Sequence, residues 1–203
     1  MVKSDKTQRI GIFGGTFNPI HHGHLINIEL LLEHFNLDHV LFIPAKIPVH
    51  KNVDGKVTPA DRLKMVELAI EGSEKFSFSG IELNRESASY TITTLHELEE
   101  IYPGDDLFLI IGSDSFNELD TWKDYKNILS GYKIIVMMRP GDTELREDLL
   151  THALKVERYS GALIEISSSM IRERVKSSLP VRYLTTDNVI EFIRIKGLYK
   201  IGQ

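Results

Sequence analysis

The sequence contains no cysteine, no long apolar run and no excess of positive charge. Without cysteine, the 203 residues can form neither a disulfide framework nor a thiolate metal site. No apolar segment approaches the roughly 20 residues that cross a membrane as a helix. The net charge of −5 argues against broad binding to nucleic acid and against a polybasic membrane surface. We therefore expect neither nucleic acid nor membrane as a partner.

The length and the composition indicate a single globular domain over residues 1–203. The first nine residues are polar and lack the apolar stretch of a signal peptide, so we expect a cytoplasmic protein. The sequence is compatible with a homo-oligomer but does not fix the oligomeric state. An anionic ligand would need local positive charge, for which Lys46, Lys51, Arg62, Arg139 and Arg172 are candidates, although the helical position of Arg62 favours a structural role.

Strand and helix patterns alternate along the chain. Short apolar segments predict strands at residues 9–13, 39–44, 76–78, 81–83, 107–111, 133–138 and 163–166. Helical periodicity and helix-start signals predict helices at residues 24–35, 59–71, 90–101, 143–156, 169–175 and 187–196. The strands are continuously apolar, which is typical of a sheet covered on both faces. Together these patterns predict an α/β fold with a doubly wound, mostly parallel sheet of the Rossmann-like kind, in which ligands bind at the carboxyl ends of the strands.

The most informative segment, residues 10–25, is an apolar strand followed by a glycine turn and a group of histidines. His21, His22 and His24 open an amphipathic helix, where imidazoles and backbone N–H groups would stabilise a phosphate. The segment is neither a Walker A loop nor a GxGxxG motif. A solvent-exposed turn and a histidine metal site are the alternatives. The histidines do not have the i, i+4 spacing of helix-borne metal ligands, so phosphate binding is favoured.

A second cluster lies at residues 165–172, where Ser167, Ser168 and Ser169 precede Arg172. The alternative is ordinary capping of a helix, for which a single serine is enough. Three serines with an arginine one turn later bring hydroxyl, N–H and guanidinium groups to one place. This second cluster therefore also points to an anionic ligand.

The two clusters resemble the (H/T)xGH and ISSTxIR motifs of the nucleotidyltransferase superfamily. Residues 21–24 match the first motif, and residues 166–172 match the second, with Ser169 where threonine is usual. Within the superfamily, the chain is similar to the bacterial nicotinate mononucleotide adenylyltransferases over almost its whole length. Residues 44–51, 82–95 and 111–122 also resemble motifs of that family, with Thr93 where aspartate is common.

The resemblance implies that ATP and nicotinate mononucleotide are the substrates. It implies that ATP is bound by Gly14, Gly15, Thr16, Phe17, His21, His24, Gly112, Asp114, Ser167, Ser168, Ser169 and Arg172. It assigns the mononucleotide to Asn18, Lys51, Tyr90, Thr91, Asp114, Trp122 and Lys123. His21, His24 and Arg172 would be the catalytic residues, and Trp122 would stack on the pyridine ring. No residue is implied as a metal ligand, because Mg²⁺ would arrive bound to ATP and keep several waters.

The implied reaction joins ATP and the mononucleotide into a dinucleotide and releases pyrophosphate. Its nucleophile is a phosphate whose second pKa is about 6, so no general base is needed. Catalysis would then depend on positioning and on stabilising charge.

Two alternatives stay open at this point. A related adenylyl- or cytidylyltransferase could act on phosphopantetheine or a polyol phosphate, because both clusters handle only the nucleoside triphosphate. A catalytically silent nucleotide sensor is the alternative from a different class. The chain is too short and too acidic for an aminoacyl-tRNA synthetase, which shares similar motifs.

Overall fold

The computed structural model describes residues 7–46, 57–85, 89–138 and 144–200. Six strands run in chain order: β1 (Arg9–Gly15), β2 (His39–Pro44), β3 (Phe76–Phe78), β4 (Asp106–Gly112), β5 (Lys133–Met138) and β6 (Lys155–Ser160). The helices within these ranges are α1 (His22–His34), α2 (Pro59–Ile70), α3 (Thr91–Ile101), α4 (Ser113–Asn117), the 3₁₀ turn η1 (Leu119–Thr121), α5 (Tyr125–Gly131), α6 (Glu147–Leu150), α7 (Ser168–Lys176) and α8 (Asp187–Lys196).

All six strands form one parallel sheet in the order β3-β2-β1-β4-β5-β6. The central strand β1 aligns Phe13 with Phe42 of β2 on one side and with Ile110 of β4 on the other. The strand order reverses between β1 and β4, which is the point where open sheets of this class bind ligands. The structure confirms the predicted fold class.

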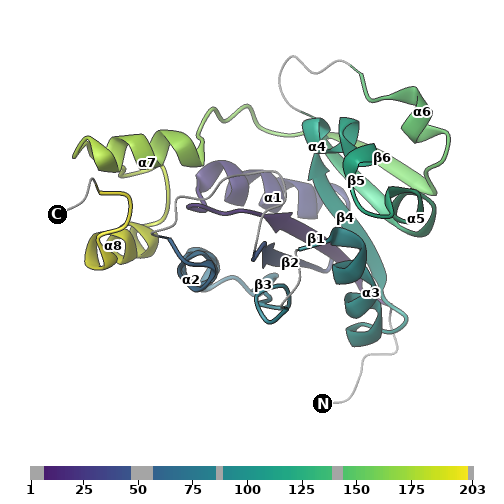
Figure 1. Cartoon of the computed structure of the whole chain (residues 1–203), viewed down its shortest axis with the longest axis horizontal. Coiled ribbons are helices and arrows are strands. Elements are labelled where there is room, and N and C mark those ends of the chain that lie inside the picture. The colour runs from purple at the N-terminus through teal and green to yellow at the C-terminus, as the bar shows by residue number, and fades with distance from the viewer. Residues whose placement is uncertain (1–6, 47–56, 86–88, 139–143, 201–203) are drawn as a thin grey trace.

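Helices cover both faces of the sheet (Figure 1). Successive residues along each central strand point into opposite cores. In β4, Phe108 and Ile110 belong to the core on one face, and Leu107 and Leu109 belong to the core on the other. Buried residues of α1, α2 and α8 join the first core, and buried residues of α3 to α6 join the second. Burial on both faces explains why the strands read as continuous apolar runs.

Local signals place several helix ends as expected. Thr58 caps α2: its hydroxyl accepts the N–H of Asp61 at 3.1 Å, and the Asp61 carboxylate accepts the N–H of Thr58 at 3.1 Å. Pro59 occupies the first turn, where its missing N–H costs nothing. Gly197 ends α8 in the left-handed conformation, with φ at 62°.

Three predicted elements are wrong. Residues 81–83 form a turn rather than a strand, and residues 163–166 form no regular structure. Of the helix expected at 143–156, the described part, residues 144–156, is helical only in α6, and its end begins strand β6. Strand β6 lies at the sheet edge with polar residues on its exposed side, so it lacks the apolar run that marks the central strands.

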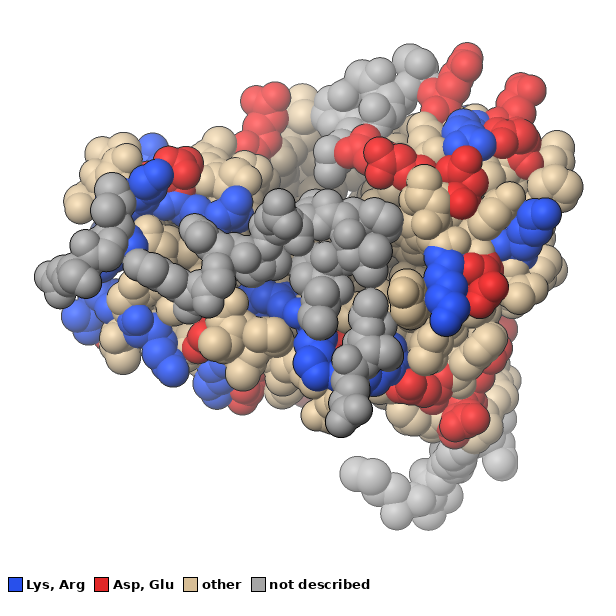
Figure 2. All heavy atoms as spheres, viewed as in Figure 1, with Lys and Arg blue, Asp and Glu red and all other residues tan. Residues whose placement is uncertain are grey.

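The segment between β6 and α7 returns across the molecule, so α7 and α8 lie together at one end, and α5 and α6 lie at the other (Figure 1). Lys and Arg side chains gather over α7 and α8, whereas Asp and Glu gather near α6 (Figure 2). The positive charge is therefore local despite the net charge of −5. In the described part of the chain, no helix has the length and apolarity needed to cross a membrane.

Among the glycines of the described strands, Gly11 of β1 leaves the least room for a Cβ atom. A Cβ atom there would lie 2.7 Å from Ile110 Cδ1, 3.0 Å from Leu37 Cδ1 and 3.1 Å from Val40 Cγ2, all of them buried. We expect Gly11→Ala to lower the free energy of unfolding by about 1–3 kcal/mol, because the core must shift to admit the methyl group.

Urea denaturation at pH 7 measures this effect, with Gly131→Ala as the control. A Cβ atom at the exposed Gly131 meets no atom of the described chain within 4 Å, so the control should be neutral or stabilising. Equal stability of the two variants would show that the sheet tolerates a side chain at position 11.

Candidate active site

The loop that leaves β1, residues 16–20, is tied to distant parts of the chain through its backbone carbonyl groups. Arg62 Nη1 donates to the carbonyl of Thr16 at 2.8 Å, and Thr185 Oγ1 donates to that of Ile20 at 2.8 Å. Buried carbonyl groups need such partners. These bonds therefore fix the course of the loop between β1 and α1.

Arg62 of α2 is almost completely buried, with 1% of its surface exposed. Its second terminal nitrogen, Nη2, donates to the carbonyl of Lys46 at 3.0 Å, and burial lowers the pKa of the guanidinium. Both terminal nitrogens therefore bind backbone. The expected structural role of Arg62 is confirmed.

The start of α7 lies against the same loop. Ser168 Oγ donates to the carbonyl of Pro19 at 2.8 Å, and Arg172 Nη1 donates to the carbonyl of Asn18 at 2.8 Å. Arg172 Nη2 donates to Ser169 Oγ at 3.0 Å. These two contacts join residues 149 and 154 positions apart in the sequence, so the two sequence clusters form one site.

Two helix N-termini meet there. Ser167 caps α7 by accepting the N–H of Met170 at 3.1 Å, and His21 is the N-cap residue of α1. Gly23 lies between them: a Cβ atom at this position would come within 3.0 Å of His21 Nδ1 and 3.4 Å of the Ile166 carbonyl. The positive ends of two helix dipoles beside an arginine favour an anion.

The rings of His21 and His24 stack with their centroids 3.7 Å apart. The His21 N–H donates to His24 Nδ1 at 3.3 Å, so the hydrogen of a neutral His24 ring lies on Nε2. Burial, with a smaller effect of His22, lowers the pKa of His21 from 6.5 to about 4. His21 is therefore neutral at pH 7 and acts as a dipole rather than a charge.

A pocket of about 290 Å³ opens beside this site, at the carboxyl ends of β1, β2 and β4. The predicted site residues that line it are Gly14, Gly15, Thr16, Tyr90, Thr91, Gly112, Trp122 and Lys123. Trp122 is half-buried at the end of η1, and Lys123 Nζ lies 4.7 Å from the centre of the Tyr90 ring. The pocket offers aromatic surface and the nearby Lys123 cation, which suits a flat anionic ring.

The structure does not place the side chains of Phe17 and Asp114 in this pocket. Phe17 is 3% exposed and packs between Phe13 and His24, so its side chain belongs to the core and only its backbone can serve a ligand. Asp114 is exposed in the first turn of α4 and does not line the pocket. Lys51 lies outside the described residues.

Several residues that hold the site in place have no signal in the sequence. Thr185 is 1% exposed and holds the loop, and the N–H of His22 donates to the carbonyl of Leu184 at 3.0 Å. Tyr199, beyond α8, donates its hydroxyl to Asn18 Oδ1 at 2.7 Å. These residues belong to no local motif, and only the three-dimensional path of the chain brings them to the loop.

No group of three His, Asp or Glu side chains is placed to hold a metal ion in the part of the chain that the structure describes.

The burial of His21 predicts a pH-dependent stability. The native pKa lies below the unfolded value of 6.5, so the unfolded chain binds a proton that the native chain excludes as the pH falls from 6.5 towards 4. Stability is unaffected by His21 above pH 6.5 and declines below it, by up to roughly 3 kcal/mol at the acid end of this window.

Urea denaturation between pH 4.5 and 7 tests this expectation. His21→Asn should flatten the slope of unfolding free energy against pH, whereas the exposed control His152→Gln should leave it as in the wild type. Burial also lowers the pKa of His39, so part of the slope should persist in both variants. An unchanged slope in His21→Asn would contradict a buried neutral His21.

Comparison with known proteins places the chain in a family. The cytidylyltransferase-like family model matches residues 12–174. A "probable nicotinate-nucleotide adenylyltransferase" of Desulfitobacterium hafniense is 39% identical over 200 residues, which cover 96% of this chain and 97% of the relative. A protein of the same description from Citrifermentans bemidjiense is 41% identical over 211 residues, which cover 94% and 98%.

Solved structures agree in fold. The Plasmodium falciparum nicotinic acid mononucleotide adenylyltransferase, complexed with APC, superposes with a TM-score of 0.75 at 18% identity, over 95% of this chain and 97% of that one. Its complex with NaAD gives a TM-score of 0.74 at 20% identity, again over 95% and 97%. At these identities the structures show the fold, while the curated relatives show the family. The chain belongs to the cytidylyltransferase-like family and, within it, to the nicotinate-nucleotide adenylyltransferases.

Proposed function

We propose that this enzyme transfers the adenylyl group of ATP to nicotinate mononucleotide, forming nicotinate adenine dinucleotide and pyrophosphate. The observation that carries the proposal is the contact of the α7 N-terminus with the loop that leads into α1, next to the pocket at the switch point of the sheet. The helix N-termini suit a chain of phosphates, and the pocket suits a pyridine ring. We also propose that the enzyme works in the cytoplasm.

On the ATP side, we assign the triphosphate to the N-termini of α1 and α7. His24 would donate from Nε2, Arg172 would supply the positive charge, and the hydroxyl and N–H groups of Ser167–Ser169 would complete the contacts. The backbone of Gly14–Phe17 would run beside the nucleotide, with Gly112 and Asp114 near its ribose. Arg172 already holds Asn18 through its carbonyl, so it would act from a fixed position.

On the acceptor side, we assign the pyridine ring to Trp122. The nicotinate carboxylate would lie at the N-terminus of α3, near Tyr90, Thr91 and Lys123, where a helix dipole and a cation favour it. Asn18 and Lys51 would contact the phosphate of the mononucleotide. This arrangement directs that phosphate towards the triphosphate site.

The chemistry needs no deprotonation of the nucleophile, because the acceptor phosphate is largely ionised at pH 7. One of its oxygens attacks the α-phosphorus of ATP, and the bond from that phosphorus to the bridging oxygen breaks to release pyrophosphate. A neutral His21 supplies hydrogen bonding without charge. The rate would come from in-line positioning and from fixed donors that stabilise the developing charge.

A divalent cation is expected to take part with ATP, and we propose Mg²⁺. The described residues offer no set of His, Asp and Glu ligands for it. It would therefore be held by triphosphate oxygens and water, as Mg²⁺ commonly is. When bound, it would neutralise part of the phosphate charge.

Removal of the His24 imidazole tests the assignment of the ATP side. We expect His24→Ala to lower kcat by roughly 10²–10³, the usual effect of losing one fixed donor at a developing charge. The exposed His152→Ala serves as the control. Near-normal turnover by His24→Ala in steady-state assays would refute the role of His24.

The acceptor is tested by measuring pyrophosphate release from Mg-ATP with four candidates: nicotinate mononucleotide, nicotinamide mononucleotide, phosphopantetheine and glycerol 3-phosphate. We expect a strong preference for nicotinate mononucleotide. A preference for another acceptor would keep the triphosphate site and reject the acceptor site. ATP binding without turnover of any acceptor would favour a nucleotide sensor.

A further inference from the structure

Glu82 is a buried acid that the proposed chemistry does not use. It lies in the turn after β3, is 8% exposed and lines the same pocket as Tyr90 and Trp122. Acidic side chains are almost never buried unless they are paired. Its surroundings therefore indicate what it does.

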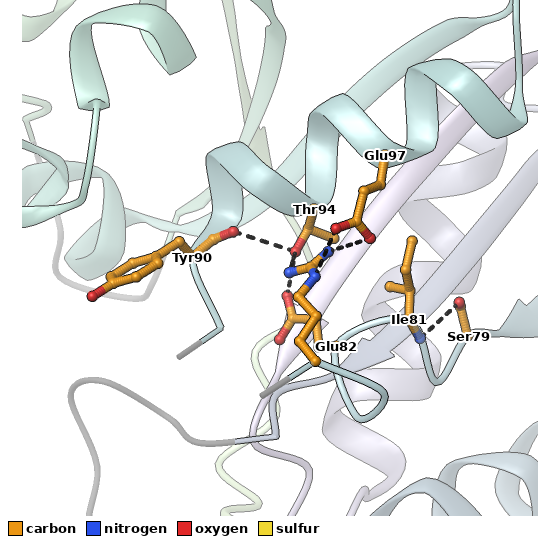
Figure 3. Close-up of polar contacts among 7 residues, drawn as sticks. Ser79, Ile81, Glu82, Tyr90, Thr94 and Glu97 are labelled. Atoms are coloured by element: carbon orange, nitrogen blue, oxygen red, sulfur yellow. Dashed lines mark hydrogen bonds and ion pairs between the residues drawn. The ribbon is translucent and has the colours of Figure 1, made fainter. Parts of the chain in front are cut away.

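One oxygen of Glu82 is fixed by a chain of hydrogen bonds (Figure 3). Arg85 donates to both carboxylate oxygens of Glu97, at 2.8 and 2.7 Å, and to Thr94 Oγ1 at 2.9 Å. Arginine only donates, so the Thr94 oxygen accepts there. The one hydroxyl hydrogen of Thr94 faces two acceptors, Glu82 Oε1 at 2.7 Å and the Tyr90 carbonyl at 3.3 Å, and the closer, charged oxygen of Glu82 is favoured. The second carboxylate oxygen, Oε2, has no hydrogen-bond partner among the described residues.

Glu82 lies between the two halves of the active site. Through Thr94 it contacts α3, whose N-terminus we assign to the pyridine ring. On its other side it is close enough to Arg62 to interact with it electrostatically, and Arg62 holds the loop after β1 through Thr16. In a mononucleotide with its ring at Trp122 and its phosphate at that loop, the ribose joins the two. The ribose is therefore the part of the ligand that lies next to Glu82.

The charges of the pocket agree with this placement. A carboxylate such as Glu82 repels another carboxylate, so the nicotinate group is favoured beside the Lys123 cation, which lies over the Tyr90 ring, rather than against Glu82. Ribose hydroxyls are donors, and a carboxylate oxygen is a strong acceptor. The chemistry that fits Oε2 is therefore a sugar hydroxyl.

We propose that Glu82 Oε2 accepts a hydrogen bond from a ribose hydroxyl of the acceptor mononucleotide, and so selects ribonucleotides over deoxyribonucleotides. This inference rests on the proposed function, since it assumes a mononucleotide in the pocket. Thr94 and Arg85 act as positioning residues that hold the carboxylate in place. Glu97 completes the chain of hydrogen bonds but does not line the pocket.

The test compares kcat/KM for nicotinate mononucleotide with that for its 2′-deoxy and 3′-deoxy analogues. In the wild type, loss of the bonded hydroxyl should lower kcat/KM by roughly 10- to 100-fold, as for other hydrogen bonds to a charged group. Glu82→Gln can keep its oxygen on Thr94 and then presents an NH₂ group to the pocket, which cannot accept. This variant should therefore use the ribose and deoxyribose substrates almost equally.

Glu97→Gln is the matched control, because it makes the same change in the same hydrogen-bond chain outside the pocket. It should keep the wild-type ratio between the two substrates. The role of Glu82 is overturned if Glu82→Gln loses as much kcat/KM with the deoxy analogue as the wild type does. It is also overturned if neither analogue lowers kcat/KM in the wild type. Either result leaves the proposed function intact. No turnover of nicotinate mononucleotide by the wild type overturns the proposed function and this inference with it.

Discussion

Four backbone carbonyl groups between Thr16 and Ile20 accept hydrogen bonds from side chains that lie 46 to 165 residues away. This loop leaves the central strand at the switch point of the sheet, where neither sheet nor helix can pair all of its backbone. An unpaired buried carbonyl costs about 1–3 kcal/mol, so the partners are a requirement of the fold. They come from α2, α7 and the segment before α8. Meeting this requirement brings the N-terminus of α7 beside that of α1.

The site follows from that constraint. Arg172 reaches the loop through Asn18 and reaches Ser169 with its other nitrogen, so one side chain joins the histidine segment to the serine segment. The pocket shares the end of β1 and Thr16 with this loop, and Tyr90 and Thr91 at the start of α3 and Trp122 just after η1 complete its lining.

The sequence predicted the features that depend on local or repeated patterns. Apolar runs located the central strands, Thr58 and Pro59 located the start of α2, and two motifs located the loop and α7. Strand β6 was missed because an edge strand buries less and keeps polar residues. The contact of Tyr199 with Asn18 was not predicted either, because pairing across 181 residues leaves no local signal. The role proposed for Glu82 could not be predicted from the sequence, because it depends on the buried position of this side chain between α3 and Arg62.

We propose one continuous site, from Trp122 to the N-termini of α1 and α7, that holds both halves of the product. A crystal structure of the protein with nicotinate adenine dinucleotide measures this directly. We expect the pyridine ring to lie against Trp122 and the diphosphate to lie between His24 and Arg172. A pyridine ring outside this pocket, or a diphosphate away from both helix N-termini, would contradict it.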